Sequence, residues 1–106
     1  MVKKQTEQEL LREATRYLQI METCQNCFFF RSASGGIKTE NRFFRTGRKG
    51  VQDITCLYKG KFIAIELKTI TGKQSPEQKE IERLVKRHGG EYYIIRSLDE
   101  LKAIIN

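Results

Sequence analysis

The chain has 106 residues, of which 39% are hydrophobic, and its 20 Lys and Arg against 13 Asp and Glu give a formal charge of +7. This size and the periodic apolar content predict a single globular domain over residues 1–106 and exclude a disordered chain. The charge favours a polyanionic partner, with DNA or RNA ahead of a membrane surface, over a merely basic soluble protein. No run of the sequence is long and apolar enough to span a bilayer, and the charged, Gln-rich start is unlike a signal peptide.

The three cysteines, Cys24, Cys27 and Cys56, are too few for a disulfide framework. They therefore predict a reducing, cytoplasmic location. Cys24 and Cys27 have the spacing of half a zinc site, which Cys56 and the only histidine, His88, could complete. The alternative is that these are ordinary buried or half-buried thiols.

A helix is predicted near the N-terminus. Apolar residues recur at three- and four-residue spacing from Leu10 to Met21, as on one face of an amphipathic helix. Thr6 and Glu9 have the spacing of a capping box at its start.

An aromatic strand and a basic segment follow this helix. Cys27–Arg31 (CFFFR) is typical of a short strand, and the turn Ser34–Gly36 ends it. The basic stretch Lys38–Gly50 is either strand or loop, and it is the best candidate for contact with nucleic-acid phosphates, against the alternative of a solvated basic loop. The candidate phosphate donors, including Lys73 further along the chain, are Arg31, Ser34, Lys38, Arg42, Arg45, Arg48, Lys49 and Lys73.

A β-hairpin is predicted in the middle of the chain. The runs Val51–Tyr58 and Lys61–Ile70 are rich in apolar and β-branched residues, and Lys59-Gly60 between them is a plausible two-residue loop. With this loop, residues whose numbers sum to 119 face one another, so Asp53 lies opposite Glu66. Because side chains alternate along a strand, Lys68 projects to the same side as Glu66.

The C-terminal part predicts helix, strand and helix. Ser75-Pro76 opens a helix that runs to about His88 and ends at Gly89-Gly90. Glu91–Arg96 (EYYIIR) is a strand, and Ser97 caps a last short helix. The order αβββαβα predicts an α/β domain with a mixed β-sheet flanked by helices. A right-handed crossover makes the strand from Glu91 parallel to the strand that carries Glu66.

Asp53 and Glu66 predict a metal site beside Lys68. Opposed like charges are destabilising, and a divalent cation would offset their repulsion. The alternative is that both carboxylates pair with nearby Arg or Lys on an exposed face, with Lys68 protecting a strand edge. The metal site is favoured because Glu66 interrupts the apolar run FIAIEL, where burial makes an unpaired charge unfavourable.

The acidic pair and the lysine resemble the PD-(D/E)xK nuclease superfamily and, more closely, the VRR-NUC family of virus-type replication-repair nucleases. The resemblance rests on Lys49–Asp53, on Glu66-Leu67-Lys68 starting thirteen residues after Asp53, and on Ser75-Pro76-Glu77-Gln78 opening a helix. It also includes the Glu7 region and the Ser34-Gly35 turn, so it spans nearly the whole chain. Gln52 departs from the superfamily pattern, because many members carry proline before the aspartate.

This resemblance implies a restriction-endonuclease-like αβββαβ core and a Mg²⁺ cofactor that Mn²⁺ can replace. It also implies hydrolysis of a phosphodiester, in which Lys68 positions or deprotonates a water. The implied catalytic residues are Asp53, Glu66, Lys68 and Gln78, and the implied metal ligands are Asp53, Glu66, the carbonyl of Leu67, and Glu7.

Two of these assignments leave alternatives open. Glu7 is the glutamate of the first helix expected to reach the metal, directly or through a water, with Glu9 and Glu13 as competitors. Gln78 either helps to order the active site beside Lys68 or closes a capping box with Ser75.

The leading hypothesis is therefore a Mg²⁺-dependent, structure-selective DNA endonuclease related to stand-alone, phage-type VRR-NUC proteins. The resemblance implies branched DNA such as Holliday junctions as the substrate, a homodimer as the assembly, and a bacterial or phage-infected cell as the source. The alternatives are a non-catalytic nucleic-acid-binding module with a nuclease fold, or a subunit of a larger replication or repair complex.

Overall fold

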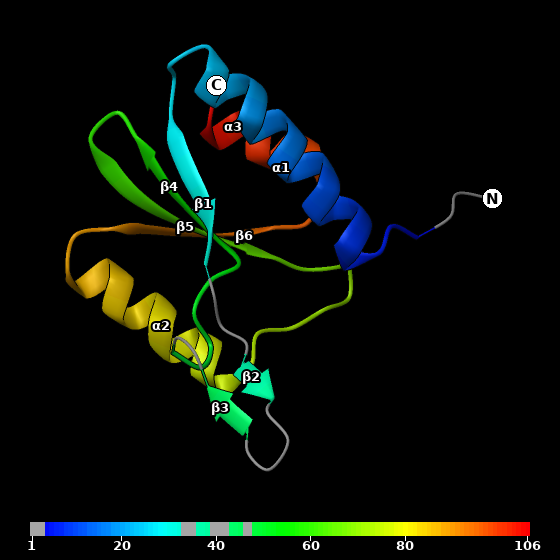
Figure 1. The fold of residues 1–106 in the computed structure, drawn as a ribbon, viewed down its shortest axis with the longest axis vertical. Helices are drawn as coiled ribbons and strands as arrows, with labels where there is room; N and C mark the ends of the chain where they lie inside the picture. Colours follow the sequence, from blue (N-terminus) through cyan, green and yellow to red (C-terminus); the bar gives the residue numbers. More distant parts are fainter. Residues whose placement is uncertain (1–3, 33–35, 39–42, 46–47) are drawn as a thin grey trace.

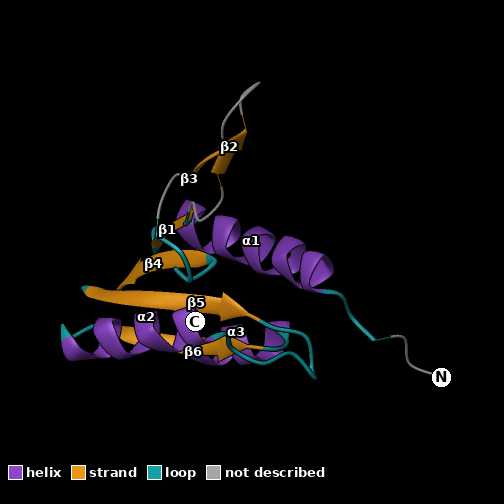
Figure 2. Ribbon diagram, turned by 90° about the horizontal axis from the view of Figure 1, so that it is seen from below, coloured by secondary structure: helices purple, strands orange, loops and turns teal. Residues whose placement is uncertain are grey.

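The computed structural model describes residues 4–32, 36–38, 43–45 and 48–106. Its main sheet has four strands in the order β1-β4-β5-β6, and β2 and β3 pair as a separate antiparallel hairpin (Figures 1 and 2). In chain order the elements are α1 (Glu7–Thr23), β1 (Phe28–Arg31), β2 (Gly36–Lys38), β3 (Phe43–Arg45), β4 (Ile54–Tyr58), β5 (Lys61–Leu67), α2 (Pro76–Arg87), β6 (Glu91–Ile95) and α3 (Leu98–Ile104).

The central hairpin has the predicted register. Ile54 faces Ile65 and Tyr58 faces Lys61, so the paired numbers sum to 119. Lys59 and Gly60 both have positive φ, at 52° and 76°, as the favoured two-residue hairpin turn requires. The strands are shorter than predicted, because β4 begins after Asp53 and β5 ends before Lys68.

The sheet is mixed, and helices cover both of its faces. β1 and β5 are antiparallel to β4, whereas β5 and β6 are parallel, which confirms the predicted parallel pairing. Figure 1 shows α1 and α3 on one side of the sheet and α2 on the other. The basic segment Lys38–Gly50, predicted as strand or loop, contains β3, and β2 begins before it, at the last residue of the predicted turn. The β2–β3 hairpin is an addition to the three strands expected before α2.

The main hydrophobic core lies under α1 and α3. Leu10 and Leu18 of α1 and Leu101 of α3 pack there with the sheet residues Ile54 and Ile65, and all are almost fully buried. Thr6 and Glu9 form the predicted capping box that begins α1. None of the helices in the described part has the length and apolar character that a membrane crossing requires.

The four residues of the zinc alternative do not come together as one set. Cys56 is buried on the α1 side of the sheet, Cys24 is exposed after α1, and His88 ends α2 on the opposite side. Burial raises the pKa of the Cys56 thiol to about 12, which disfavours the thiolate that a metal would need.

Candidate active site

Asp53 lies at the point where β4 begins, and its carboxylate is held against β5. The Leu67 N–H donates a hydrogen bond to Asp53 Oδ2 over 2.8 Å. The backbone carbonyl of Asp53 accepts from the Ser32 N–H at 2.9 Å, which fixes the residue between the ends of β1 and β5. The two hydrogen bonds hold the half-buried Asp53 side chain beside the end of the strand that carries Glu66.

Glu66 is a buried carboxyl group, with only 1% of its surface exposed. Burial, followed by the hydrogen bond and the charge of Asp53, raises its pKa from 4.5 to about 9, although Lys68 opposes this shift. A protonated Glu66 can donate to Asp53, and the hydroxyl of Tyr92 lies 3.5 Å from Glu66 Oε2. The structure therefore brings Asp53, Glu66 and Lys68 together, as the hairpin register predicted.

The donors at this site fit a hard divalent cation such as Mg²⁺. Two carboxyl groups share one partly buried position, and a cation there would offset the repulsion between them. Glu7, Asp53 and Leu67 also line one cavity of about 90 Å³. Within the described ranges, no three His, Cys, Asp or Glu side chains lie close enough to bind one ion together. Glu7 would therefore need a bridging water or a side-chain rotation to contact a cation held by Asp53 and Glu66.

The competing glutamates of α1 have other partners. Glu9 accepts hydrogen bonds from Thr6 in the capping box, and Glu13 accepts one from Gln5. Glu7 is thus the glutamate of α1 that lines the cavity beside Asp53.

Lys68 is half-buried and is followed by a loop that Arg96 holds in place. The Lys68 N–H donates to Ile95 O over 3.1 Å, which continues the pairing of β5 with β6. Arg96 Nη1 donates to the carbonyls of Thr69 at 2.6 Å and Gly72 at 2.9 Å. Because the Arg96 guanidinium binds these carbonyls, it restricts the loop and the backbone that positions Lys68.

Gln78 occupies the third position of α2 and closes the capping box with Ser75. The Ser75 N–H donates to Gln78 Oε1 at 2.9 Å, and the Gln78 N–H donates to Ser75 Oγ at 3.1 Å. The capping alternative is confirmed, and a role for Gln78 in ordering the active site stays a prediction.

Gly50 allows the loop before Asp53 to approach the start of α2. Its φ is +84°, and a Cβ atom there would lie 2.6 Å from the backbone carbon of Glu77. Across this contact Lys49 Nζ forms an ion pair with Glu77 Oε1 at 3.1 Å. Only glycine leaves room for this close approach, which explains the glycine three residues before Asp53.

The predicted phosphate-binding residues lie in several parts of the structure. Arg31 ends β1, Arg48 precedes Gly50, and Lys73 lies between β5 and α2, all with exposed side chains. Lys49 is exposed but paired with Glu77. Predictions for Ser34, Arg42 and the side chains of Lys38 and Arg45 fall outside the described residues.

Several polar residues near the site were missed by the sequence analysis. Gln74 Nε2 donates to the Tyr92 hydroxyl at 3.3 Å and to Glu82 Oε1 at 3.0 Å, which supports the tyrosine beside Glu66. The predicted parallel pairing of β5 with β6 could have found Tyr92, since it pairs with Ala64 two residues before Glu66. Gln52 is also buried, and no periodic pattern in the sequence indicates this.

Comparison with known proteins supports this fold. No family model matches the sequence, and no curated protein matches it. A solved structure described as "VRR_NUC domain" is similar with a TM-score of 0.65 over 93% of this chain and 92% of that chain. The chain has the fold of a VRR_NUC domain. The two sequences are 15% identical, so the similarity concerns the fold alone.

Proposed function

We propose that this VRR_NUC-like domain is a Mg²⁺-dependent DNA endonuclease that hydrolyses phosphodiester bonds in branched DNA such as Holliday junctions. The observation that carries the proposal is the buried carboxyl of Glu66 against Asp53, with Lys68 two residues further along the chain, just after β5. A stable fold has no need of this arrangement, because it places two carboxyl groups together with burial opposing the ionisation of Glu66.

Each residue of the site has a role that its chemistry supports. Asp53 and Glu66 would supply oxygen ligands to the metal, with Leu67 and Glu7 lining the cavity beside Asp53. A bound Mg²⁺, or Mn²⁺ in its place, would polarise the scissile phosphate and lower the pKa of a bound water. Lys68 would orient that water or accept its proton, and would stabilise the charge that develops on the phosphate.

Nucleic-acid binding is supported by the charge of +7 and by exposed basic side chains near the site, including Arg31, Arg48 and Lys73. Contacts from such residues to phosphates give affinity that falls steeply with salt and carries little sequence preference. A homodimer belongs to the same proposal, because paired cuts across a branched substrate need two active sites related by a two-fold axis.

The test is cleavage of a labelled four-way junction beside a matched linear duplex, in Mg²⁺, Mn²⁺ or EDTA. We expect metal-dependent, junction-selective cutting that Asp53→Ala and Glu66→Gln each reduce by about a thousandfold. Asp99→Ala, which removes an exposed carboxylate in α3, is the matched control and should cut as the wild type does.

Tight junction binding without cutting in either metal would overturn the nuclease proposal and favour a non-catalytic binding module or a subunit that needs a partner. Cutting that persists in Asp53→Ala would place the catalytic residues elsewhere in the chain.

A further inference from the structure

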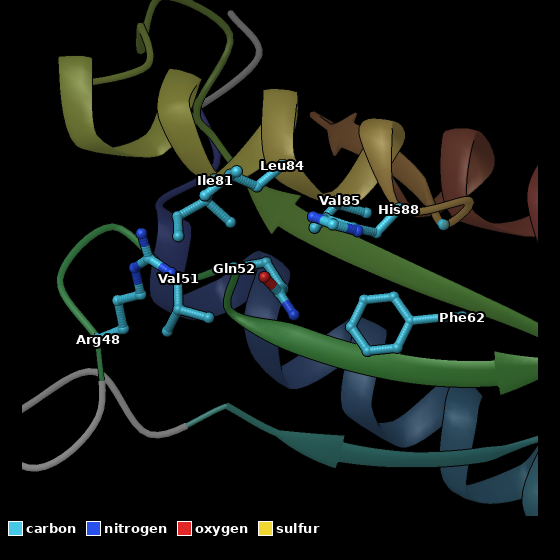
Figure 3. A pocket seen from close by; sticks show the side chains of 9 residues that line it. Arg48, Val51, Gln52, Phe62, Ile81, Leu84, Val85 and His88 are labelled. Atoms are coloured by element: carbon cyan, nitrogen blue, oxygen red, sulfur yellow. The ribbon is translucent and has the colours of Figure 1, made fainter.

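A second, larger cavity lies between α2 and the hairpin of β4 and β5. It encloses about 480 Å³, within the range of sites that bind small ligands. Figure 3 shows Ile81, Leu84 and Val85 of α2 along one side and the ring of Phe62 on β5 at one end. The lining residues are Arg48, Val51, Gln52, Phe62, Ile81, Leu84, Val85, His88 and Gly90.

The carboxamide of Gln52 lies in the middle of this mostly apolar lining, and part of it has no partner (Figure 3). Gln52 is only 3% exposed, and its Nε2 donates to Thr55 Oγ1 at 2.8 Å. Oε1 is buried without a hydrogen-bond partner. Rotating the amide by 180° would exchange the two atoms and leave Nε2 in that position instead. A buried polar group without a partner is unfavourable. Because Oε1 is itself buried, the Gln52 side chain would turn toward the cavity to reach a complementary group of a ligand there.

We infer that this cavity binds a single unpaired nucleobase of the DNA substrate. A base is a flat, largely apolar ring system that can stack on Phe62 and pack against the aliphatic side chains of α2. Its edge carries hydrogen-bond donors and acceptors, either of which can pair with the free atom of Gln52. The other amide atom of Gln52 is already hydrogen-bonded to Thr55. Gln52 can therefore make one hydrogen bond to a base rather than two, so the site tolerates different bases.

The charge around the cavity favours a nucleotide over a second copy of this chain. Arg48 brings a guanidinium group to the lining, where it can contact the phosphate attached to a bound base. A second copy would bring a further charge of +7 to this face, which disfavours the cavity as the dimer surface, whereas a polyanion is attracted to it. An apolar surface from another protein would also leave the Gln52 amide without a partner.

The position of Gln52 links this cavity to the proposed active site. Gln52 and Asp53 are consecutive residues, whose Cα atoms are about 3.8 Å apart, so a base bound at Gln52 brings its own backbone close to Asp53. The inference rests on the proposed function and specifies its substrate. The strand that is cut should present an unpaired or unstacked base near the branch point, as at a bulge, a flap, a splayed arm or an opened four-way junction.

The test measures binding in EDTA, so it does not depend on cleavage. The probes are a labelled duplex with one bulged thymidine and the same duplex with an abasic residue in the bulge, which has the same number of phosphates. By fluorescence anisotropy, we expect the wild type to bind the thymidine bulge about tenfold more tightly. Gln52→Leu should reduce this preference by about threefold, and Leu84→Phe, which fills the cavity, should abolish it.

Matched controls are Gln19→Leu and Ile20→Phe, which make similar changes on the exposed face of α1 and should keep the full preference. Thermal unfolding and sedimentation of every variant show whether its fold and oligomeric state are intact. The two cavity variants give independent tests if one of them does not fold.

Equal binding of the two probes by the wild type would overturn the inference while leaving the nuclease proposal standing. A preference that survives both folded cavity variants would place the base site elsewhere. A wild-type dimer that Leu84→Phe dissociates, with no base preference, would show that a second copy covers this face. No binding of either probe would overturn the inference, and the junction cleavage assay tests the proposed function separately.

Discussion

The two faces of the sheet differ in the size of their apolar core and in the polar groups that they bury. Among the described residues, the face under α1 and α3 joins thirteen buried side chains in one core, whereas the cluster under α2 contains three, Ala64, Ile81 and Tyr92. The α2 face also holds the buried Glu66 and Gln52 and the larger cavity. The contrast indicates that the α1 face supplies most of the stability, which allows unfavourable polar groups to persist on the α2 face.

Leu18→Ala should have the largest effect on stability. Leu18 is fully buried in α1, so the substitution leaves a cavity in a closely packed core and should lower the free energy of unfolding by about 3 kcal/mol. Ile81→Ala is the counterpart on the other face and should lower it by about 2 kcal/mol, because Ile81 already borders open space. Urea unfolding of both variants measures the difference. Equal losses would contradict the division of roles between the faces.

Glu66→Gln should stabilise the protein in the absence of metal. Between pH 4.5 and about 9 the folded chain retains the Glu66 proton that the unfolded chain has lost, so the free energy of unfolding falls as pH rises through this window. At pH 7 this retained proton lowers the free energy of unfolding by on the order of 3 kcal/mol. Glu66→Gln has no proton to lose, so it should restore this stability. Thermal unfolding from pH 5 to 9 in EDTA checks this, and Mg²⁺ should raise the Tm of the wild type alone. If the Tm of the wild type and the Tm of Glu66→Gln had the same pH dependence, Glu66 would be ionised in the folded chain.

Gly50→Ala should separate the loop before Asp53 from α2. The new Cβ atom would clash with the backbone of Glu77 and would require φ of +84°, at a cost of about 2 kcal/mol. Gly60→Ala is the matched control, because its φ is +76° and nothing lies within 4 Å of its Cβ position. We expect it to cost about 1 kcal/mol, by conformation alone. Similar losses of Tm for both variants would show that the contact with Glu77 is unimportant.

Lys49→Met should have the smallest effect on stability. Its ion pair with Glu77 is largely exposed, and such pairs contribute about 0.5 kcal/mol or less. We expect unchanged urea unfolding and weaker junction binding in EDTA, with a salt dependence reduced by about one phosphate contact. A large loss of stability would show that this ion pair, rather than Gly50, holds the loop against α2.

Local sequence signals predicted most of the fold. The Lys59-Gly60 loop determined the register of β4 with β5, and Ser75 with Gln78 marked the start of α2. The same register brought Asp53 to Glu66, so the centre of the candidate site was predictable from a two-residue turn and strand alternation. The β2–β3 hairpin was not predicted, because its basic, glycine-bearing sequence lacks a clear period of two.

Other features depend on residues that are distant in the sequence. Tyr92 meets Glu66 across parallel strands, Arg96 holds the loop after β5, and α2 closes a cavity over Gln52. The sequence by itself determined the elements, the hairpin register and the identity of the acidic pair, because these follow from side-chain periodicity and turn geometry within short segments. Only the tertiary structure decided that the Tyr92 hydroxyl lies beside Glu66 and that one atom of Gln52 has no partner. Burial and hydrogen-bond satisfaction depend on which side chains from other elements pack around a residue.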